Sequence, residues 1–428
     1  MPRDFQIPST YRSEKISTLK TIRRELDSRK RDFEPTVFSF ANVDIALARF
    51  FGFCFGVENA IERAYQAVEE NPNKRVFLLS EMIHNPFVNQ NLQARGVRFL
   101  QSTEGKSFIS LSELTPEDIV IVPAFGTTVE LFRELEERGI PFQSYDTTCP
   151  FVEKVWKRSN QLGSLGFTVV IHGKHEHEET RATFSHASTN APSIVVRDKK
   201  EAQQLIDCIR GTVSSEDIVS RFSERMTPGF DPQKDLERIG VVNQTTMLAS
   251  ETHEISLMFR AAFLEKYCEE GLRGHFADTR DTLCYATNEN QTAAQALAAS
   301  GGDLALVVGG YNSSNTSHLV ELLEKSCPTY FIRDAEEIED ESLIRHLDIH
   351  LWEVRSTRAW FKKKSPKLRV LVTAGASCPD AVVEGVIQKV LQMSGDLEQY
   401  DQVFERTLER LRVNVGHPSG SLPVLGQG

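Results

Sequence analysis

Three cysteines lie in stretches whose residues could carry metal chemistry. Cys54 occurs in Gly-Phe-Cys-Phe-Gly, Cys149 in Asp-Thr-Thr-Cys-Pro and Cys284 in Asp-Thr-Leu-Cys-Tyr, so the last two share the pattern Asp-Thr-x-Cys. Each cysteine stands where a strand is expected to give way to a helix. A thiolate beside a helix N-terminus is stabilised by the helix dipole and by unpaired backbone N–H groups. We therefore expect three thiolates to converge on one soft metal centre, which would be the active site.

The seven cysteines are odd in number and widely spaced, which does not suggest a disulfide framework. Packing as small hydrophobic residues is the alternative for any cysteine, and it suits Cys208, Cys268 and Cys327 best. Cys378, in Gly-Ala-Ser-Cys-Pro, fits either interpretation. Cuboidal iron–sulfur clusters normally take four thiolates. Three thiolates would leave one iron open to act as a Lewis acid on a substrate oxygen.

Histidines and glutamates gather at the end of one expected strand. The run 171–180, Ile-His-Gly-Lys-His-Glu-His-Glu-Glu-Thr, follows the apolar stretch 167–171 and supplies proton donors. A zinc site is the alternative, although the His-Glu-x-x-His spacing is absent. His84, in Ile-His-Asn-Pro, also follows an apolar strand, but a single histidine is more often structural than catalytic.

Small polar loops follow three further strands, at 244–246, 309–315 and 373–377. Hydroxyls and backbone N–H groups at helix starts can bind a phosphate without a positively charged protein. Each loop alone could be a helix cap, whereas three together favour phosphate binding. With 49 basic and 60 acidic residues the net charge is −11, which argues against nucleic acid or an anionic membrane as the main partner.

Apolar runs of strand length alternate with helical patterns, which predicts an α/β protein with parallel sheets covered on both faces. The expected strands are 43–48, 75–79, 119–123, 168–172, 193–197, 239–242, 304–308 and 369–373. No apolar run is long enough to span a membrane. Residues 1–42 predict an amphipathic helix, 210–238 a surface insertion, and 397–411 a last helix before a flexible tail. A cytoplasmic protein is expected, because no signal sequence is recognisable.

These stretches together resemble the 4-hydroxy-3-methylbut-2-enyl diphosphate reductase family. The motifs occur in the family's order from about 43 to 392: Gly-Phe-Cys-x-Gly-Val, His-Asn, Asp-x-Thr-Cys-Pro, His-x-Glu, Gln-Thr-Thr, Cys-Tyr-Ala-Thr, Asn-Ser-Ser-Asn and Thr-Ala-Gly-Ala-Ser-x-Pro-Asp. The resemblance implies a trefoil of three similar α/β lobes around one [4Fe-4S] cluster per chain, held by Cys54, Cys149 and Cys284. The implied ranges are an extension 1–42, lobes 43–145, 146–280 (with the insertion) and 281–395, and a tail 396–428.

The resemblance also implies roles for single residues. Glu179 matches the family's proton-delivering glutamate, and the substrate-binding set matches His84, His177, Thr245, Asn288, Ser313, Ser314, Asn315 and Ser377. One departure is Phe125, in Ala-Phe-Gly, where many members have a histidine that contacts the diphosphate. Phe125 makes the anion pocket less cationic, and Lys174 could compensate. This departure resembles the longer cyanobacterial and plant branch of the family.

The activity implied is a reductive dehydration of 4-hydroxy-3-methylbut-2-enyl diphosphate to isopentenyl and dimethylallyl diphosphates, the last step of the non-mevalonate isoprenoid pathway. No G-x-G-x-x-G fingerprint for a flavin or nicotinamide is present, so reduced ferredoxin or flavodoxin is the expected electron donor. Two alternatives remain open. A non-redox hydro-lyase would use the cluster only as a Lewis acid, and an iron–sulfur carrier or sensor would have no use for a diphosphate pocket.

Overall fold

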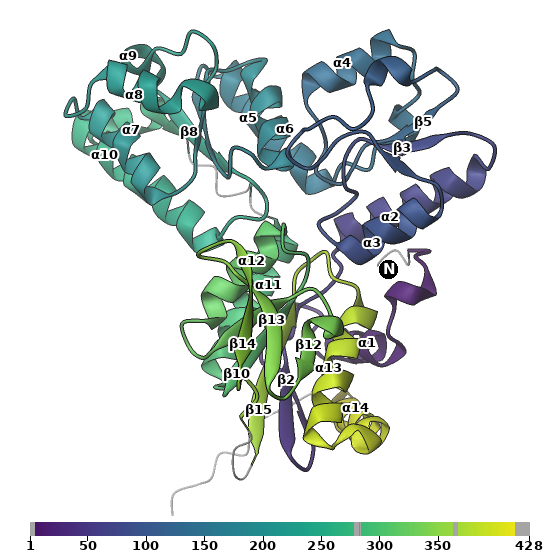
Figure 1. Ribbon diagram of the computed structural model, residues 1–428. Helices are drawn as coiled ribbons and strands as arrows, with labels where there is room; N and C mark the ends of the chain where they lie inside the picture. The colour runs from purple at the N-terminus through teal and green to yellow at the C-terminus, as the bar shows by residue number, and fades with distance from the viewer. Residues whose placement is uncertain (1–4, 278–281, 283, 363–366, 416–428) are drawn as a thin grey trace, which may run out of the picture. The chain divides into compact units, whose positions relative to one another are not determined.

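The computed structural model describes residues 5–277, 282, 284–362 and 367–415 (Figure 1). Asp281 and Leu283 of the third cysteine motif, and residues 416–428 of the expected tail, lie outside the described residues. The chain divides into two compact units, one formed by Met1–Ile7 and Cys54–Asn288 and the other by Pro8–Phe53 and Glu289–Gly428. No helix within the described ranges is long and apolar enough to cross a membrane.

The first unit contains two separate parallel sheets. The smaller has the strand order β4-β3-β5, and its core is built from residues such as Phe77, Val120 and Leu135. Its elements are α2 (Phe55–Glu70), β3 (Val76–Leu78), α3 (Pro86–Ala94), β4 (Arg98–Phe99), η2 (Leu111–Glu113), β5 (Ile119–Ile121), α4 (Val129–Glu137) and η3 (Gln143–Tyr145). The central strand β3 and its neighbour β5 are fully buried, and β3 is joined to β4 through α3, as a βαβ crossover requires.

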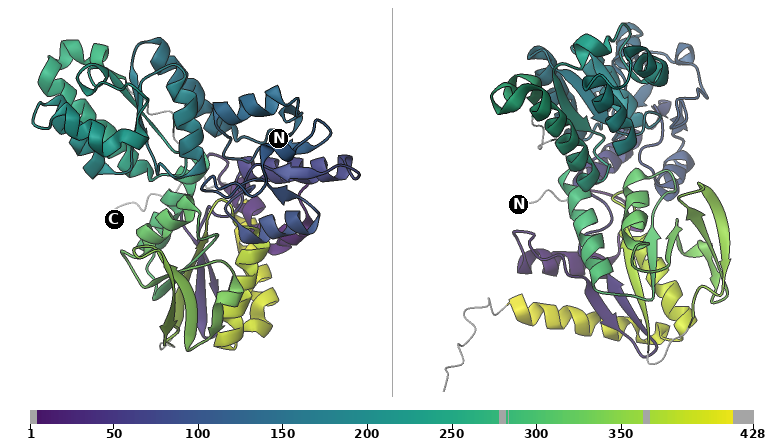
Figure 2. Two further views of the ribbon diagram at one scale, coloured as in Figure 1. Left: turned by 45° about the horizontal axis from the view of Figure 1, so that its top comes forward. Right: turned by 90° about the vertical axis from the view of Figure 1, so that its left-hand side faces the viewer.

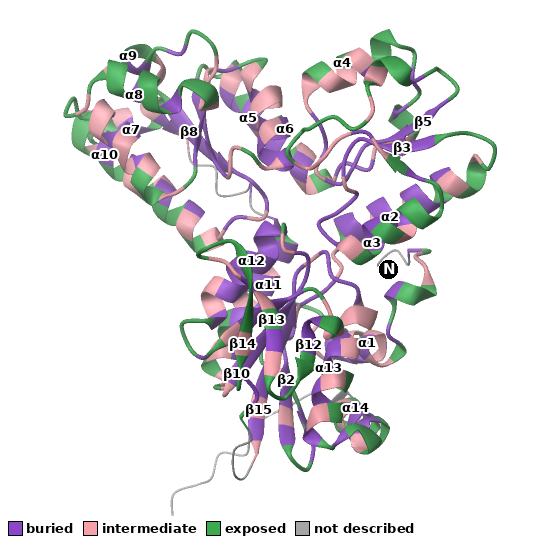
Figure 3. Cartoon of the chain, in the orientation of Figure 1, coloured by how far each residue is buried: buried purple, intermediate pink, exposed green. Residues whose placement is uncertain are grey.

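The second sheet of this unit has the order β7-β6-β8-β9 and is also parallel. Its elements are α5 (Pro150–Ser164), β6 (Thr168–His172), α6 (Glu178–Ser188), β7 (Ser193–Val196), α7 (Lys199–Ile209), α8 (Ser215–Phe222), η4 (Ser223–Arg225), α9 (Pro232–Asp235), β8 (Ile239–Asn243), α10 (Ala249–His275) and β9 (Phe276–Ala277). Every residue of β6, β7 and β8 is buried (Figure 3), as expected for strands covered on both faces.

The expected surface insertion at 210–238 is a folded part of this sheet's surroundings. It forms α8 and α9, and Ile218 and Phe222 of α8 are fully buried in the core beside the sheet. Met226 also forms an isolated bridge with Ile194 of β7. The spacing of Ile218 and Phe222, four residues apart, is the helical signal that the polar composition of the segment obscures.

The second unit is built on an eight-stranded mixed sheet with the order β1-β2-β15-β10-β11-β13-β12, and with β14 paired to β13. Its elements are η1 (Ser9–Tyr11), α1 (Glu14–Leu26), β1 (Thr36–Ser39), β2 (Val43–Leu47), α11 (Tyr285–Ala299, whose first turn belongs to the first unit), β10 (Leu304–Val308), α12 (Ser314–Leu323), β11 (Thr329–Ile332), η6 (Ala335–Glu337), β12 (Ile338–Asp340), β13 (Leu343–Asp348), β14 (Glu353–Arg358), β15 (Leu368–Ala374), α13 (Asp380–Ser394), η7 (Leu397–Gln399) and α14 (Tyr400–Val415). Figure 1 shows α11 and α13 on opposite faces of this sheet.

Two findings in this unit differ from the expected lobe boundaries. Strand β2, placed in the first lobe from its sequence position, pairs in parallel with β15, so it belongs to the sheet of the third lobe. The N-terminal extension contributes β1 and the amphipathic helix α1, whose Ile16, Leu19 and Ile22 are buried as predicted. Phe38 of β1 stacks on Phe404 of α14, with ring centroids 4.0 Å apart. Strand β1 and helix α14, which are far apart in the sequence, are therefore parts of one core.

An antiparallel addition extends the same sheet. Strands β12, β13 and β14 follow β11 and form its edge (Figure 2). All but one residue of β14 are exposed, so the alternation that marks a half-buried strand is missing from its sequence. The α/β class with parallel sheets is confirmed, and the antiparallel strands at the two edges are additions to it.

Candidate active site

Each of the three cysteines lies directly before a helix. Cys54 and Cys149 precede α2 and α5, and Cys284 precedes α11, which confirms the prediction that all three stand at helix N-termini. A Cβ atom added to Gly56 would lie 2.5 Å from the Sγ of Cys149. Only glycine therefore allows α2 to start this close to the second thiol. The sulfur atoms interact electrostatically, since Cys149 and Cys284 both raise the pKa of Cys54.

Burial dominates the electrostatics of these thiols and raises the pKa of all three. Backbone N–H groups of the helix that follows each cysteine act in the opposite direction: they stabilise the thiolate and lower the pKa. Such sites hold protonated thiols in the free protein and become favourable for thiolates once a cation is bound. No three His, Cys, Asp or Glu side chains of the described chain are grouped so that they could hold a metal ion.

The Asp-Thr-x-Cys pattern has a structural explanation. The Thr147 hydroxyl donates to the backbone oxygen of Val122, just beyond β5, at 2.5 Å. The Thr282 hydroxyl donates to Oδ1 of Asn243, at the end of β8, at 2.7 Å. In both motifs the threonine fixes the loop against the carboxyl end of a strand. The cysteine two residues later is positioned as a result.

Glu179 is a buried carboxyl held by one neighbour. It is 1% exposed and lies in the first turn of α6. Its Oε1 accepts from the backbone N–H of Thr245 at 2.5 Å, and its Oε2 accepts from the Thr245 hydroxyl at 3.0 Å. Burial raises the pKa of Glu179 to about 7, although both bonds from Thr245 oppose that shift. The carboxyl therefore exchanges its proton near neutral pH.

His84 and His177 meet within the first unit. Their Nε2 atoms are 3.2 Å apart. Nδ1 of His177 accepts from the N–H of Glu179 at 3.2 Å, so in neutral His177 the proton is on Nε2 and points at His84. Nδ1 of His84 then carries its proton toward Glu81, whose Oε2 is 3.6 Å away. Burial, and then the charge of His84, keep the pKa of His177 well below its usual value.

Phe125 covers this pair of histidines. Its ring stacks on His84 with centroids 4.3 Å apart and meets His177 edge-on at 5.7 Å. Gly126 follows with φ +74°, and a side chain there would collide with Trp156. Phe125 therefore orients His84 by packing, and its ring has no donor for a hydrogen bond.

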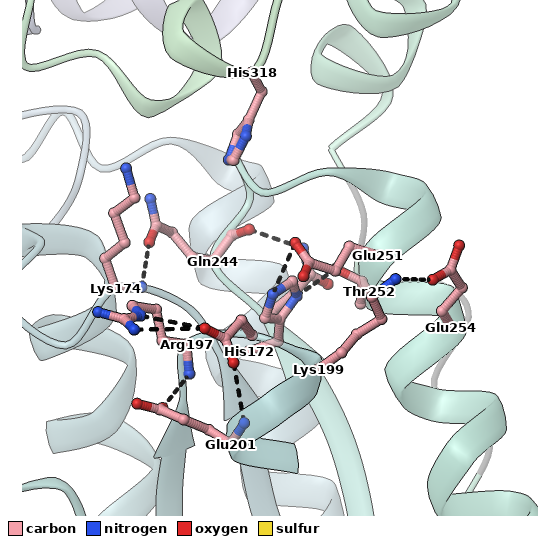
Figure 4. A network of polar contacts seen from close by, with 12 residues as sticks. His172, Lys174, Arg197, Lys199, Glu201, Gln244, Glu251, Thr252, Glu254 and His318 are labelled. Carbon is pink, nitrogen blue, oxygen red and sulfur yellow. Dashed lines mark hydrogen bonds and ion pairs between the residues drawn. The ribbon is translucent and has the colours of Figure 1, made fainter. Parts of the chain in front are cut away.

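Gln244 joins the loop after β6 to the end of β8 (Figure 4). Its Oε1 accepts from the N–H of Lys174 at 3.1 Å and from the Thr180 hydroxyl at 2.9 Å. Nearby, Nδ1 of His172 lies 2.8 Å from the Thr252 hydroxyl. His172 and His177 thus bind different neighbours, so the histidine-rich run does not form one cluster of ligands. The network fixes the loop that leads into Glu179.

Four candidate residues lie in the second unit, at the carboxyl ends of two adjacent parallel strands. β10 pairs with β15, and each strand is followed by a polar loop. Ser313 caps α12, and its Oγ accepts from the N–H and the hydroxyl of Thr316 at 3.3 and 2.9 Å. A Cβ on Gly375 would collide with that Thr316 hydroxyl, which shows how closely the two loops approach. The loops thus bring together Ser313, Ser314, Asn315 and Ser377.

Asn315 is the least satisfied of these residues. It is 3% exposed, and both atoms of its amide are buried without a hydrogen-bond partner within the described ranges. A buried unpaired amide costs free energy, so such a group indicates a missing partner. Ser377 is 8% exposed, and Asn288 lies on the exposed side of α11, where its N–H donates to the Cys284 carbonyl at 3.1 Å.

The remaining cysteines differ among themselves. Cys327 and Cys378 are buried and Cys208 is half-buried, in keeping with packing roles. Cys268 is exposed and has φ +57° within α10, so the expectation that it packs as a hydrophobic residue is wrong. Glu178 belongs to the run 171–180, but its hydrogen bond with Ser80, which joins segments 98 positions apart, is not predicted from the sequence. No local pattern indicates that contact.

The fold and these residues define an α/β protein with three electrostatically coupled thiols at helix starts. It also has a buried carboxyl with a raised pKa, and polar loops at helix starts, a type of loop that can bind phosphate. The model of the LytB protein family matches residues 45–391, and the chain belongs to that family. It is 43% identical to a 4-hydroxy-3-methylbut-2-enyl diphosphate reductase of Synechococcus sp. (strain CC9605), over 82% of this chain and 86% of that protein. The corresponding protein of Gloeobacter violaceus is 39% identical, over 82% of this chain and 84% of its own length.

Solved structures agree on the fold. The structure of E-1-hydroxy-2-methyl-but-2-enyl-4-diphosphate reductase from Plasmodium falciparum is similar with a TM-score of 0.60, at 18% identity, over 82% of this chain and 89% of that chain. At this identity the likeness concerns the fold alone. It supports the α/β class, whereas the family model and the relatives from Synechococcus and Gloeobacter confirm the family resemblance found in the sequence.

Proposed function

We propose that this chain is a 4-hydroxy-3-methylbut-2-enyl diphosphate reductase, an oxidoreductase of the non-mevalonate isoprenoid pathway. Two electrons and two protons remove the C4 hydroxyl of the substrate as water and leave isopentenyl or dimethylallyl diphosphate. The observation that carries this proposal is Glu179. It is buried, its pKa is raised to about 7, and it lies within electrostatic range of Cys149 and Cys284. A proton is therefore available near two of the three thiols.

The three thiols suit a [4Fe-4S] cluster, one per chain. Each cysteine of such a cluster would bind its own iron, so the thiols need not share one ion. Gly56 lets the Cys149 thiol lie against the start of α2, where a side chain would collide with its sulfur. Cys54, Cys149 and Cys284 would hold the cluster. A cluster bound by three cysteines supplies low-potential electrons and one Lewis-acidic position.

The protein's own side chains have separate roles in this proposal. Glu179 delivers the proton that turns the departing hydroxyl into water, and Thr245 holds the carboxyl in place through two hydrogen bonds. The Nε2–H of His177 can turn from His84 to the diphosphate, and His84 can also donate once protonated. By resemblance we also assign substrate contacts to Asn288, Ser313, Ser314, Asn315 and Ser377.

Reduced ferredoxin or flavodoxin is the proposed electron donor, and the cytoplasm the proposed location. All seven cysteines are free in the structure, which suits a reducing compartment. Phosphate binding relies on local donors because the net charge is −11.

Anaerobic turnover with and without a chemical reductant tests the function. A reductase forms the two isoprenoid diphosphates only when reductant is present, and one pair of electrons is consumed per product. A hydro-lyase would turn over without reductant, and a carrier or sensor would not consume the diphosphate at all. Either of those results rejects the proposal.

Replacing Asn315 with leucine separates ligand binding from folding. Leucine is close to asparagine in shape but cannot hydrogen-bond, so diphosphate affinity should fall by about 10- to 150-fold, as for loss of one charge-assisted bond. The ligand-free protein should not become less stable, because both amide atoms lack partners within the described chain. Calorimetric titration and thermal unfolding measure the two effects. The substrate alcohol without its diphosphate is the control ligand, and an equal loss for that alcohol would contradict a phosphate role.

A further inference from the structure

Glu178 is a buried carboxyl to which the proposed reaction gives no role. It precedes Glu179 in α6 and is 7% exposed. Its Oε2 accepts from the Ser80 hydroxyl at 2.5 Å, while its Oε1 is buried without a hydrogen-bond partner within the described ranges. Burial raises the pKa of Glu178 to about 8, against the opposing effect of Ser80. The side chain is therefore uncharged at neutral pH.

The bond between Ser80 and Glu178 joins the two sheets of the first unit. Ser80 is 1% exposed and follows β3 of the smaller sheet, whereas Glu178 begins α6 beside the second sheet. The chain beyond Ser80 leads within four residues to His84, and the residue before Glu178 is His177. The 3.2 Å contact between these histidines thus lies next to the carboxyl bond. Two neighbouring contacts, Ser80–Glu178 and His84–His177, therefore join these two parts of the first unit; we call this contact region the seam.

The loop that carries His84 is stiff enough to transmit the position of Ser80. Asn89 of α3 accepts from the N–H of Met82 at 3.2 Å and donates to the Ile83 carbonyl at 2.9 Å. Asn85 caps α3 by accepting from the N–H of Val88. These bonds fix the backbone from Met82 to Val88, and this stretch, which carries His84, begins two residues after Ser80.

Burial, rather than the charged groups nearby, favours the neutral form of Glu178. Arg181, on α6, lowers the pKa of Glu178, and Glu81, on the loop after β3, raises it to a smaller extent. Arg181 donates to the backbone carbonyls of Thr103 and Glu176, at 2.9 and 3.3 Å, so its guanidinium group points to those two oxygens. A cavity of about 350 Å³ beside Ser80 and Glu178 is also lined by Arg181, Glu104, Glu130 and Glu134. Besides Glu178, three of the side chains that line this cavity are therefore carboxylates.

We propose that Glu178 is a positioning residue, whose uncharged carboxyl holds Ser80 against the start of α6 and thereby sets the spacing of His84 and His177 for a diphosphate. This inference rests on the proposed function, which supplies the diphosphate. When the carboxyl ionises, an anion with one unpaired oxygen is left in a buried seam. Water then enters from the cavity, the contact between Ser80 and Glu178 opens, and His84 and His177 no longer keep the spacing that binds the diphosphate.

The kinetic test compares KM and kcat across about pH 6 to 9.5 in the holoenzyme with a chemical reductant. Wild-type KM should rise above about pH 8, where Glu178 ionises. Glu178→Gln keeps an uncharged group that can bind Ser80, so its KM should stay flat over that range. Glu178→Ala should raise KM about 10-fold at every pH with a smaller change in kcat, as loss of binding geometry predicts. Glu176→Gln, an exposed neighbour on the same loop, is the matched control and should behave like the wild type.

Two measurements do not depend on turnover. Titration with inorganic pyrophosphate should show the same pH dependence and the same ranking of variants, so an inactive protein that still shows it would reject the function and keep this inference. Thermal unfolding tests the charge state: a raised folded pKa gives stability that is present below about pH 4.5 and lost as pH rises through about 8. The unfolding temperature of Glu178→Gln relative to wild type should therefore increase with pH. An alkaline rise in KM that persists in Glu178→Gln, or equal KM values for the Gln and Ala variants, would overturn the proposal.

Discussion

Single replacement of Cys54, Cys149 or Cys284 by serine should abolish the broad visible absorbance of an iron–sulfur protein. Serine keeps the size of the side chain but is a poor ligand for iron, which binds thiolates in these clusters. Each thiol stands at the start of a different helix, and each is electrostatically coupled to at least one other thiol. Cys378 also lies close to a helix start, before α13, but its thiol is fully buried in the core of the second unit. Loss of one ligand should therefore not be compensated.

The measurement is anaerobic purification followed by absorbance and by iron and sulfide counts per chain. Matched controls are Cys208→Ser, Cys268→Ser and Cys327→Ser, which alter thiols on α7, on the exposed break in α10 and before β11. These variants should retain the wild-type iron content. Cys378→Ala belongs with them, because that thiol is fully buried in the second unit's core. Full iron content in any of the three helix-start variants would reject the ligand assignment.

Most strands of the three parallel arrangements are predictable because their signal is local, whereas the parallel strands β4, β9 and β11 are not among those predicted. Runs such as Thr168–His172 and Leu304–Val308 are continuously apolar, and a strand buried on both faces requires that composition. The edge strands were missed for the opposite reason. β14 is exposed at nearly every position, so its pairing with β13 comes from the hairpin and leaves no hydrophobic pattern in its sequence.

Pairing between distant strands leaves no local signal either. β2 precedes Cys54 by only a few residues, yet its hydrogen-bonded neighbour is β15, more than three hundred residues later. A hydrophobic run determines that a strand forms and which faces are buried. Its partner is set by the packing of the whole unit, here by the helices α1, α13 and α14 that share its core.

The candidate site also combines residues that a local pattern predicts with contacts that it does not predict. The cysteines, Glu179 and the serine loops were identified from residue type and position after a strand, and these depend on local geometry. The tautomer of His177, the stacking of Phe125 on His84 and the Ser80–Glu178 bond depend on contacts between segments far apart in the chain. Such contacts are fixed by tertiary packing, so a single sequence contains no direct sign of them.

Glu179→Gln should lower kcat by about 10²- to 10⁴-fold and leave KM nearly unchanged, which is the contribution of a general acid. Glutamine keeps the shape and can still accept from Thr245 through its carbonyl oxygen, so the fold of the site should persist. What it lacks is a transferable proton. Wild-type kcat should fall as pH rises through about 7, because the carboxyl loses its proton there. The residual kcat of Glu179→Gln should not fall over this pH range.

His177→Asn provides the contrasting variant. Asparagine is a good N-cap, so it can replace Nδ1 in accepting the N–H of Glu179 and preserve the start of α6. It cannot place a donor where Nε2 lies, and KM for the diphosphate should rise at least as much as kcat falls. Anaerobic steady-state kinetics with a chemical reductant measure both variants, so that docking of a protein donor does not limit the rate. A Glu179→Gln enzyme with wild-type kcat would show that the proton has another source, such as the diphosphate of the substrate itself.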